Sequence, residues 1–346
     1  MNGWMNAPRA LGELNRGISR GWHTGAQLYA SLHGEVMANG AIGESRPGVP
    51  MTPSTLVEWG SATKAVTCGA AALLWQRGRF DLDDPVCRHI PEFAASGKEA
   101  VTIRHLLTHT GGLSHPVDDM MPFDEAVAAV CAAPLLEGWT PGARCAYNSV
   151  AMWIVAELVV RLSGRRFDRF VRTEVCEPLG LLDSWVGMLV EVYRSYGDRI
   201  AVVPQFSLSG AEEWVTWGRP TGGGHGPIGE LGRYYEALLH HRLLSAPVVE
   251  AMTTRHLCGV YDETLDAVVD RGLGFMLRSS YPGHSYGPHA SRRAFGHGGR
   301  NWCVAFADPS HGLAVGVYWN GRVDGDTHAE RQTALLSALY EDLGLA

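Results

Sequence analysis

The sequence predicts an α/β fold in which an α/β lobe is split along the chain by an inserted, all-α lobe. Residues 24–42 alternate short apolar runs with glycines and an HGE turn, which is typical of an antiparallel hairpin. Strand-like runs (GLGFMLR, CVAFADP and GLAVGVYWN) return only towards the C-terminus, and the pattern between them is mostly helical. An early hairpin and late strands share one sheet only if the helical stretch is an insertion.

The same patterns give the predicted bounds of the lobes. Residues 1–78 and 221–346 form the discontinuous α/β lobe, and residues 79–220 form the mainly helical lobe. A chain of 346 residues is long enough for one large domain or for two lobes that share an interface. We expect the active site in the cleft between the lobes, because binding sites favour such junctions.

Several helices are predicted along the chain. An Ala/Leu-rich helical pattern covers residues 61–77 and ends at Gly78, a residue type common just after a helix. A glycine loop, TGGGHG, enters a later helix, and the chain closes on the apolar-periodic helix HAERQTALLSALYEDLG. The helical segments of the middle lobe read TIRHLLTHTGGL, FDEAVAAVCAA, NSVAMWIVAELVVRLSG and FDRFVRTEVCEPLGL.

Composition and charge exclude several classes of protein. With 46% hydrophobic and 19% charged residues, the chain is neither disordered nor a fibrous repeat. A net charge of −7 without any basic run argues against nucleic acid and against an anionic membrane as partner. We therefore expect a small-molecule or peptide substrate, and the sequence leaves the oligomeric state open.

The N-terminal segment and the cysteines indicate in which cellular compartment the protein is expected. The N-terminal segment lacks the apolar core of a signal peptide, and charge interrupts the longer apolar runs, as Glu157 does in VAMWIVAELVV. We expect a cytoplasmic protein without a membrane segment. The seven cysteines are odd in number, scattered and without CxxC spacing, which predicts free, mostly buried thiols.

Ser61 and Lys64, in WGSATKAV, are the first candidates for chemistry. At positions i and i+3 of a helix they share one face, so the lysine can approach the hydroxyl. The helix start also offers backbone N–H groups to a developing oxyanion. A serine becomes a nucleophile only when a base takes its proton, which a partly desolvated lysine can do. The alternative is a serine that caps a helix, followed by an exposed lysine.

Three motifs follow one another in order: TPSTLVEWGSATKAV, RGRFDLDDPVCRHIPEF and VTIRHLLTHTGGL. This series resembles the serine β-lactamase and penicillin-binding-protein superfamily, in particular its class C and family VIII carboxylesterase branch. The resemblance runs from about Gly25 to the C-terminus. It implies a β-lactamase-like fold, with an antiparallel sheet flanked by N- and C-terminal helices. It also implies that Ser61 is the nucleophile and Lys64 part of its base.

The second element of that family is a Y-x-N motif, which AYNS matches in part. The resemblance gives Tyr147 the role of accepting the serine proton and passing it to the leaving group. The third position of the motif is Ser149, and the asparagine stands at Asn148 instead. We expect Asn148 and Ser149 in the substrate pocket. The displaced asparagine argues against β-lactam or D-Ala-D-Ala substrates, because it holds the substrate amide in those relatives.

The third element is the H-x-G strand of the esterase branch, matched in FGHGGRNW. The resemblance predicts His297 as a catalytic partner of the tyrosine and Gly298 and Gly299 as pocket residues. The backbone N–H groups of Ser61 and Arg300 would form the oxyanion hole. Bulky Arg300 and Trp302 would stand at the edge of the pocket and restrict the acyl site.

Other motifs predict little. His105 and His109 have the i, i+4 spacing of a zinc pair, but no glutamate lies between them and no third ligand is evident. No GxSxG elbow is present, which argues against an α/β-hydrolase. We predict no metal and no cofactor.

These observations predict a serine hydrolase that acts on ester or amide bonds through an acyl-enzyme, with carboxylesterase activity as the first choice. An acyltransferase or peptide-processing enzyme of a biosynthetic pathway would use the same acyl-enzyme. A β-lactamase comes third. A catalytically inert binding protein of the same fold is the alternative from another class.

Overall fold

The computed structural model describes residues 3, 4, 6–118, 120–279, 286–300 and 302–346. Its centre is a nine-stranded antiparallel sheet in the order β3-β2-β1-β12-β11-β10-β9-β8-β7. Its strands are β1 (Gly25–Leu32), β2 (Glu35–Arg46), β3 (Val49–Pro50), β7 (Leu257–Asp262), β8 (Ala267–Arg271), β9 (Met276–Leu277), β10 (Phe295–Gly299), β11 (Cys303–Asp308) and β12 (Leu313–Trp319).

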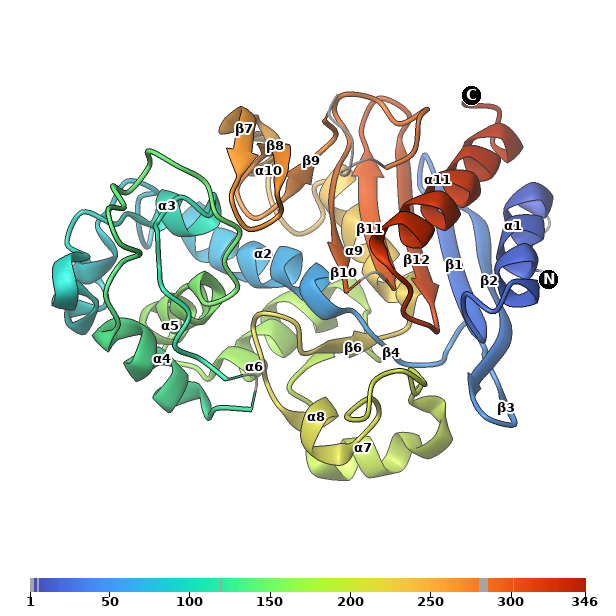
Figure 1. Ribbon diagram of the computed structural model, residues 1–346, viewed down its shortest axis with the longest axis horizontal. Coiled ribbons are helices and arrows are strands. Elements are labelled where there is room, and N and C mark those ends of the chain that lie inside the picture. Colours follow the sequence, from blue (N-terminus) through green and yellow to red (C-terminus); the bar gives the residue numbers. More distant parts are fainter. Residues whose placement is uncertain (1–2, 5, 119, 280–285, 301) are drawn as a thin grey trace.

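Helices cover both faces of this sheet (Figure 1). Helices α1 and α11 lie together near the two termini, while α3, α4 and α5 gather at the opposite end of the molecule. A small second sheet has the order β4-β6-β5, with strands β4 (Val57–Glu58), β5 (Trp185–Val186) and β6 (Gly224–Gly226). The helices are α1 (Pro8–Ser19), α2 (Thr63–Gln76), α3 (Ile103–Leu107), α4 (Phe123–Ala132), α5 (Ala151–Ser163), α6 (Phe167–Phe170), α7 (Val190–Tyr196), α8 (Glu212–Thr216), α9 (Ile228–Leu239), α10 (Ala246–Thr253) and α11 (Gly325–Asp342).

The predicted fold class is confirmed, because strands from the beginning and the end of the chain pair in one sheet. Strands β1 and β2 form the predicted antiparallel hairpin. Strand β1 also pairs with β12, with Leu28 opposite Val317, so the early and late strands share one sheet. The bounds of the lobes at residues 79 and 220 remain a prediction. In the small sheet the central strand β6 pairs with β4 on one side and with β5, from the middle of the chain, on the other.

The late strands differ in part from the sequence prediction. The run GLGFMLR contributes only the two-residue strand β9. Hairpin β7–β8 was not predicted, because most of β7 is exposed or half-buried and its residues lack a clear apolar alternation. This unpredicted hairpin contacts the loop that carries Tyr147.

Two apolar layers hold the helices on the sheet. Strand residues alternate between them: Val304 and Phe306 face α1 and α11, whereas Cys303 and Ala305 face the interior that contains α2. On the outer side, Leu14 of α1 joins this packing and is almost completely buried. Burial of each such side chain stabilises the fold by about 1.5–3 kcal/mol.

Helix α2 is the central helix, and every residue from Thr63 to Leu74 is buried. A helix that is apolar and small on all sides belongs inside a protein rather than on its surface. Lys64 is therefore enclosed, with 1% of its surface exposed. The alternative of a capping serine followed by an exposed lysine is therefore wrong.

Two further findings concern the cysteines and the membrane. All seven cysteines are free thiols, five of them buried, which confirms the prediction. Within the described ranges, no helix combines the length and the apolar character needed to cross a bilayer.

Helix α9 lies against the sheet through a glycine. A Cβ atom at Gly232 would lie 2.3 Å from Cδ1 of Tyr29 on β1, and the Tyr29 hydroxyl donates a hydrogen bond to Glu236 at 2.7 Å. The ring is buried and bonded at its far end, so it cannot move away cheaply.

We expect Gly232→Ala to destabilise the protein by about 1–3 kcal/mol through overpacking, although alanine is the better helix former. The matched control is Gly12→Ala in α1, where a Cβ would meet nothing within 4 Å. That change should stabilise by roughly 0.5–1 kcal/mol. Denaturant unfolding of both variants checks this, and equal effects would contradict the proposed contact.

Candidate active site

Ser61 lies in one turn of 3-10 helix, Gly60–Ala62, that leads directly into α2. Gly60 has a φ of +52°, a left-handed conformation that glycine adopts at little cost. The hydroxyl of Thr63 donates a hydrogen bond to the carbonyl oxygen of Gly60 at 2.7 Å, which fixes the turn. Ser61 thus stands at the N-terminal, positive end of a buried helix.

Lys64 connects Ser61 to the opposite wall. Its Nζ donates hydrogen bonds to Ser61 Oγ at 2.9 Å and to the carbonyl oxygen of Thr221 at 2.8 Å. The carbonyl holds the amine in place, one helical turn from the serine. When the amine is neutral, the same short contact lets the Ser61 hydroxyl donate its proton to Nζ.

Tyr147 stands beside this pair. Lys64 Nζ lies 5.0 Å from the centre of the Tyr147 ring, and the ring of His297 lies 6.1 Å away from it, centre to centre. The Tyr147 hydroxyl oxygen is buried and has no hydrogen-bond partner among the described residues. A buried hydroxyl without a partner calls for an explanation, and a role in proton transfer supplies one.

His297 reaches the site from β10. It lies opposite Ala305 of β11 and is nearly buried. Its Nδ1 lies 2.7 Å from the carbonyl oxygen of Gly298. Because a carbonyl only accepts, Nδ1 carries the proton, and in the neutral ring Nε2 is the acceptor.

The end of β10 passes very close to the serine turn. A Cβ atom at Gly299 would lie 2.0 Å from the carbonyl oxygen of Trp59 and 3.1 Å from the backbone nitrogen of Ser61. Only glycine fits there. This close approach places the backbone of the next residue, Arg300, beside Ser61, as an oxyanion hole built from both residues requires.

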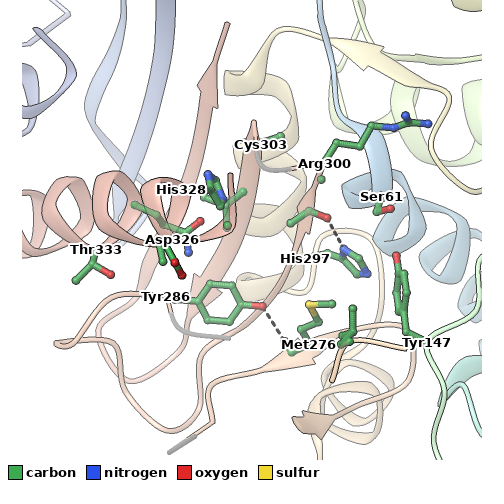
Figure 2. Close-up of a pocket in the computed structure, with 17 residues that line it drawn as sticks. Ser61, Tyr147, Met276, Tyr286, His297, Arg300, Cys303, Asp326, His328 and Thr333 are labelled. Carbon is green, nitrogen blue, oxygen red and sulfur yellow. Dashed lines mark hydrogen bonds between the residues drawn. The ribbon is translucent and has the colours of Figure 1, made fainter. Parts of the chain in front are cut away.

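A cavity of about 530 Å³ opens in front of these groups. Figure 2 shows Ser61, Tyr147 and His297 at one end of it, while Asp326 and Thr333 of α11 lie at the other end. Its lining residues are Ser61, Tyr147, Leu265, Met276, Tyr286, His297, Gly298, Gly299, Arg300, Cys303, Val304, Gly325, Asp326, His328, Ala329, Gln332 and Thr333.

Asn148, the asparagine of the tyrosine loop, makes hydrogen bonds within the fold and does not face the cavity. Asn148 Oδ1 accepts a hydrogen bond from the backbone nitrogen of Val150 at 2.8 Å, and its Nδ2 donates to the carbonyl oxygen of Leu113. Ser149 is half-buried in the turn that enters α5. Neither Asn148 nor Ser149 lines the cavity, so their pocket roles stay predictions without a contact to it.

Trp302 also lies elsewhere than expected for a residue at the pocket edge. Its side chain is 1% exposed, and its indole nitrogen donates a hydrogen bond to the carbonyl oxygen of Glu58 at 3.2 Å. The indole therefore packs in the core behind the cavity. Arg300 does line the cavity, and Figure 2 shows its side chain extending from the end of β10 past Ser61.

The two histidines with zinc-like spacing do not face one another on a helix. Helix α3 ends at Leu107, and His109 follows with a φ of +57°. His105 Nδ1 accepts a hydrogen bond from Thr102 in a capping box, whereas His109 Nδ1 accepts one from Asn148. No group of three or more His, Cys, Asp or Glu is placed to hold a metal within the residues that the structure describes.

His109 is a site neighbour that the sequence did not reveal. Its ring lies 4.8 Å from that of Tyr147, centre to centre. Burial lowers the pKa of His109 well below its usual value, and the charges of Arg271 and Lys64 lower it further. The ring is therefore neutral at physiological pH, and it fixes the tyrosine loop without adding charge.

Asp262 and Arg271 were missed as well. Asp262 accepts a hydrogen bond from the backbone nitrogen of Tyr147 at 3.0 Å, and Arg271 pairs with Asp262 at 2.6 Å. Both come from hairpin β7–β8, far along the chain from the tyrosine. Only a recognised hairpin in the run LCGVYDETLDAVVDRG would have pointed to them.

Comparison with known proteins gives a consistent result. A family model described as Beta-lactamase matches residues 12–340. Esterase EstB of Burkholderia gladioli is 34% identical over 183 residues, which are 46% of this chain and 46% of that protein. The chain thus spans less than half the length of this curated relative.

Solved structures extend the similarity to nearly the whole chain. A penicillin-binding protein homologue from Caulobacter crescentus is 29% identical with a TM-score of 0.86, over 98% of both chains. A family VIII carboxylesterase is 24% identical with a TM-score of 0.84, over 99% of both chains, which supports the fold. The predicted resemblance is confirmed, and the chain belongs to the beta-lactamase family.

Proposed function

We propose that this protein is a serine hydrolase that cleaves ester bonds through an acyl-enzyme on Ser61. The observation that carries the proposal is the 2.9 Å contact between Lys64 Nζ and Ser61 Oγ at the start of a buried helix. A surface lysine could adopt many positions, but here burial and the Thr221 carbonyl hold the amine against the hydroxyl. The name of the relative EstB, an esterase, agrees with this activity.

In the acylation step, Ser61 Oγ attacks the ester carbonyl carbon and gives its one proton to the pair of Lys64 and Tyr147, which holds the proton until the alcohol leaves. The carbonyl oxygen becomes negative and receives hydrogen bonds from the backbone N–H groups of Ser61 and Arg300. The bond between the carbonyl carbon and the ester oxygen then breaks. Tyr147, beside His297, returns the proton to the departing alcohol.

In the second step, water attacks the acyl-enzyme and releases a carboxylic acid and free Ser61. An alcohol or amine in place of water would give acyl transfer. The extent of the cavity, from Ser61 to Thr333 on α11, supports this second candidate, because it leaves space for an acceptor beyond a short acyl group. Turnover of β-lactams is disfavoured, since Asn148 is displaced from the Y-x-N position and bonded within its own loop.

The first prediction concerns the nucleophile. Brief incubation with p-nitrophenyl acetate or butyrate should add one acyl group to the wild-type protein, with release of nitrophenol, and Ser61→Ala should show neither. Intact-protein mass spectrometry reads the adduct directly. The control is Ser54→Ala, which changes an exposed serine a short distance upstream.

An adduct of equal size on Ser61→Ala would overturn the proposal. No reaction of the wild type would favour a selective transferase or an inert binding protein.

The second prediction concerns the amine. Lys64→Met keeps the length of the side chain but removes the base, so kcat/KM for p-nitrophenyl butyrate should fall by about 10²–10⁴-fold. A matched control is Lys98→Met. Lys98 is also fully buried and donates hydrogen bonds to backbone carbonyls, at Ala95 and Cys131 among others, but it lies in the helical lobe.

Lys98→Met should lower the melting temperature and leave the kcat/KM of the folded enzyme near its wild-type value. If both lysine variants lost activity in proportion to their loss of folded protein, Lys64 would have a structural role only.

The third prediction concerns the charge of Arg300. Its guanidinium carbon lies 5.4, 5.5 and 5.9 Å from the ring centres of Phe206, Trp214 and Trp302. Arg300 is one of the residues that line the cavity, and these aromatic contacts hold its permanent positive charge to one side of Ser61. We therefore expect a preference for substrates that carry a carboxylate.

The test compares p-nitrophenyl butyrate with the mono-p-nitrophenyl ester of succinic acid. In Arg300→Gln the ratio of kcat/KM for the acidic ester to kcat/KM for the neutral ester should fall about tenfold. Arg300→Lys should largely keep it. The ratio cancels changes in the oxyanion hole, which both esters use. An unchanged ratio in Arg300→Gln would show that the charge selects nothing.

A further inference from the structure

We infer that Asp262 and Arg271 are positioning residues for Tyr147: Asp262 fixes the backbone of the tyrosine loop, and Arg271 holds a permanent positive charge beside the phenol. The inference rests on the proposed function, because that function gives Tyr147 its part in proton transfer. It assigns a role in catalysis to hairpin β7–β8, which contributes neither the nucleophile nor its base.

Asp262 binds the tyrosine loop directly. Its side chain is fully buried, and Oδ1 accepts hydrogen bonds from the backbone nitrogens of Tyr147, Thr264 and Leu265 at 3.0, 3.0 and 3.1 Å. The backbone nitrogen of Glu263 donates to the carbonyl oxygen of Cys145 at 3.0 Å. One carboxylate therefore closes the hairpin turn and joins it to the residue that carries the phenol.

Arg271 supplies the charge. It is 2% exposed, and its Nη2 donates to Asp262 Oδ2 at 2.6 Å. Its guanidinium carbon lies 5.4 Å from the centre of the Tyr147 ring. A cation at this place stabilises negative charge that develops on the phenol oxygen while protons move. Unlike Lys64, an arginine keeps its charge while protons move, so the phenol always has one cation beside it.

The other groups that face the phenol do not replace this charge. His109 is neutral, as its lowered pKa requires. His297 and Lys64 lie within the proposed proton path itself. Burial opposes ionisation of Asp262, but the charge of Arg271 and the hydrogen bond from Tyr147 outweigh it, so the pKa of Asp262 lies below its usual value. The buried pair is therefore an ion pair at neutral pH.

A purely structural ion pair would also explain the contacts, so the test needs a measurement that folding alone does not change. The rate at which a fluorophosphonate probe labels Ser61 is suitable when it is followed as a function of pH. Loss of folded protein lowers the labelled amount at every pH. Loss of the charge beside Tyr147 should instead move the rising, acidic part of the profile to higher pH, because removal of a proton is easier beside a cation.

Two replacements of the charge are compared. In Arg271→Gln the rising part of the profile should move to higher pH by about one unit, and in Arg271→Lys it should stay within a few tenths of a unit of wild type. Arg271→Gln leaves a buried carboxylate without its cation and so risks misfolding. The double variant Asp262→Asn/Arg271→Gln removes both charges and should shift in the same direction, by less.

The matched control is the neighbouring ion pair of Arg255 and Asp270, which lies 3.1 Å apart on the same part of the fold. Arg255→Gln/Asp270→Asn should leave the pH profile unchanged. The inference is overturned if wild type labels and the two Arg271→Gln variants share its profile. If wild type takes no label at all, with Ser61→Ala as the blank, the proposed function fails instead.

Discussion

The burial of α2 on all sides is the constraint on which the rest of the site depends. A helix of small and apolar residues fills the centre of the molecule from Thr63 to Leu74. A lysine in its first turn is then almost completely buried, and it bonds to oxygens of Ser61 and Thr221. Packing around α2 thus holds the serine, the amine and the helix start together. An exposed lysine, by contrast, could turn its amine towards water.

The sheet supplies the second half of the site through the glycines of β10 and the shortness of the neighbouring strand β9. Strand β9 pairs only with Phe295 and Gly296 of β10, so within the described residues the end of β10 at His297 to Gly299 has no partner strand on that side. Gly299 lets this end lie against the serine turn. The cavity forms where the sheet stops, next to the start of the central helix.

The tyrosine loop joins the two sides of the molecule. His109, just beyond α3, holds it from one side and Asp262 holds it from hairpin β7–β8. A phenol fixed from both sides keeps its distance from Lys64 even when no substrate is bound. Such preorganisation is what electrostatic catalysis requires, because the groups need not rearrange as charge develops.

The sequence by itself determined the features that obey local rules. The spacing of Ser61 and Lys64, the hairpin of β1 and β2, the Ala/Leu-rich helix after Ser61 and the family motifs could all be read from neighbouring residues. Tertiary structure alone decided that Arg271 faces Tyr147 and that Trp302 packs in the core. It also decided that α3 ends between His105 and His109, so that the two do not share a helix face. These features depend on which distant segments meet, and no local pattern of residues encodes such contacts.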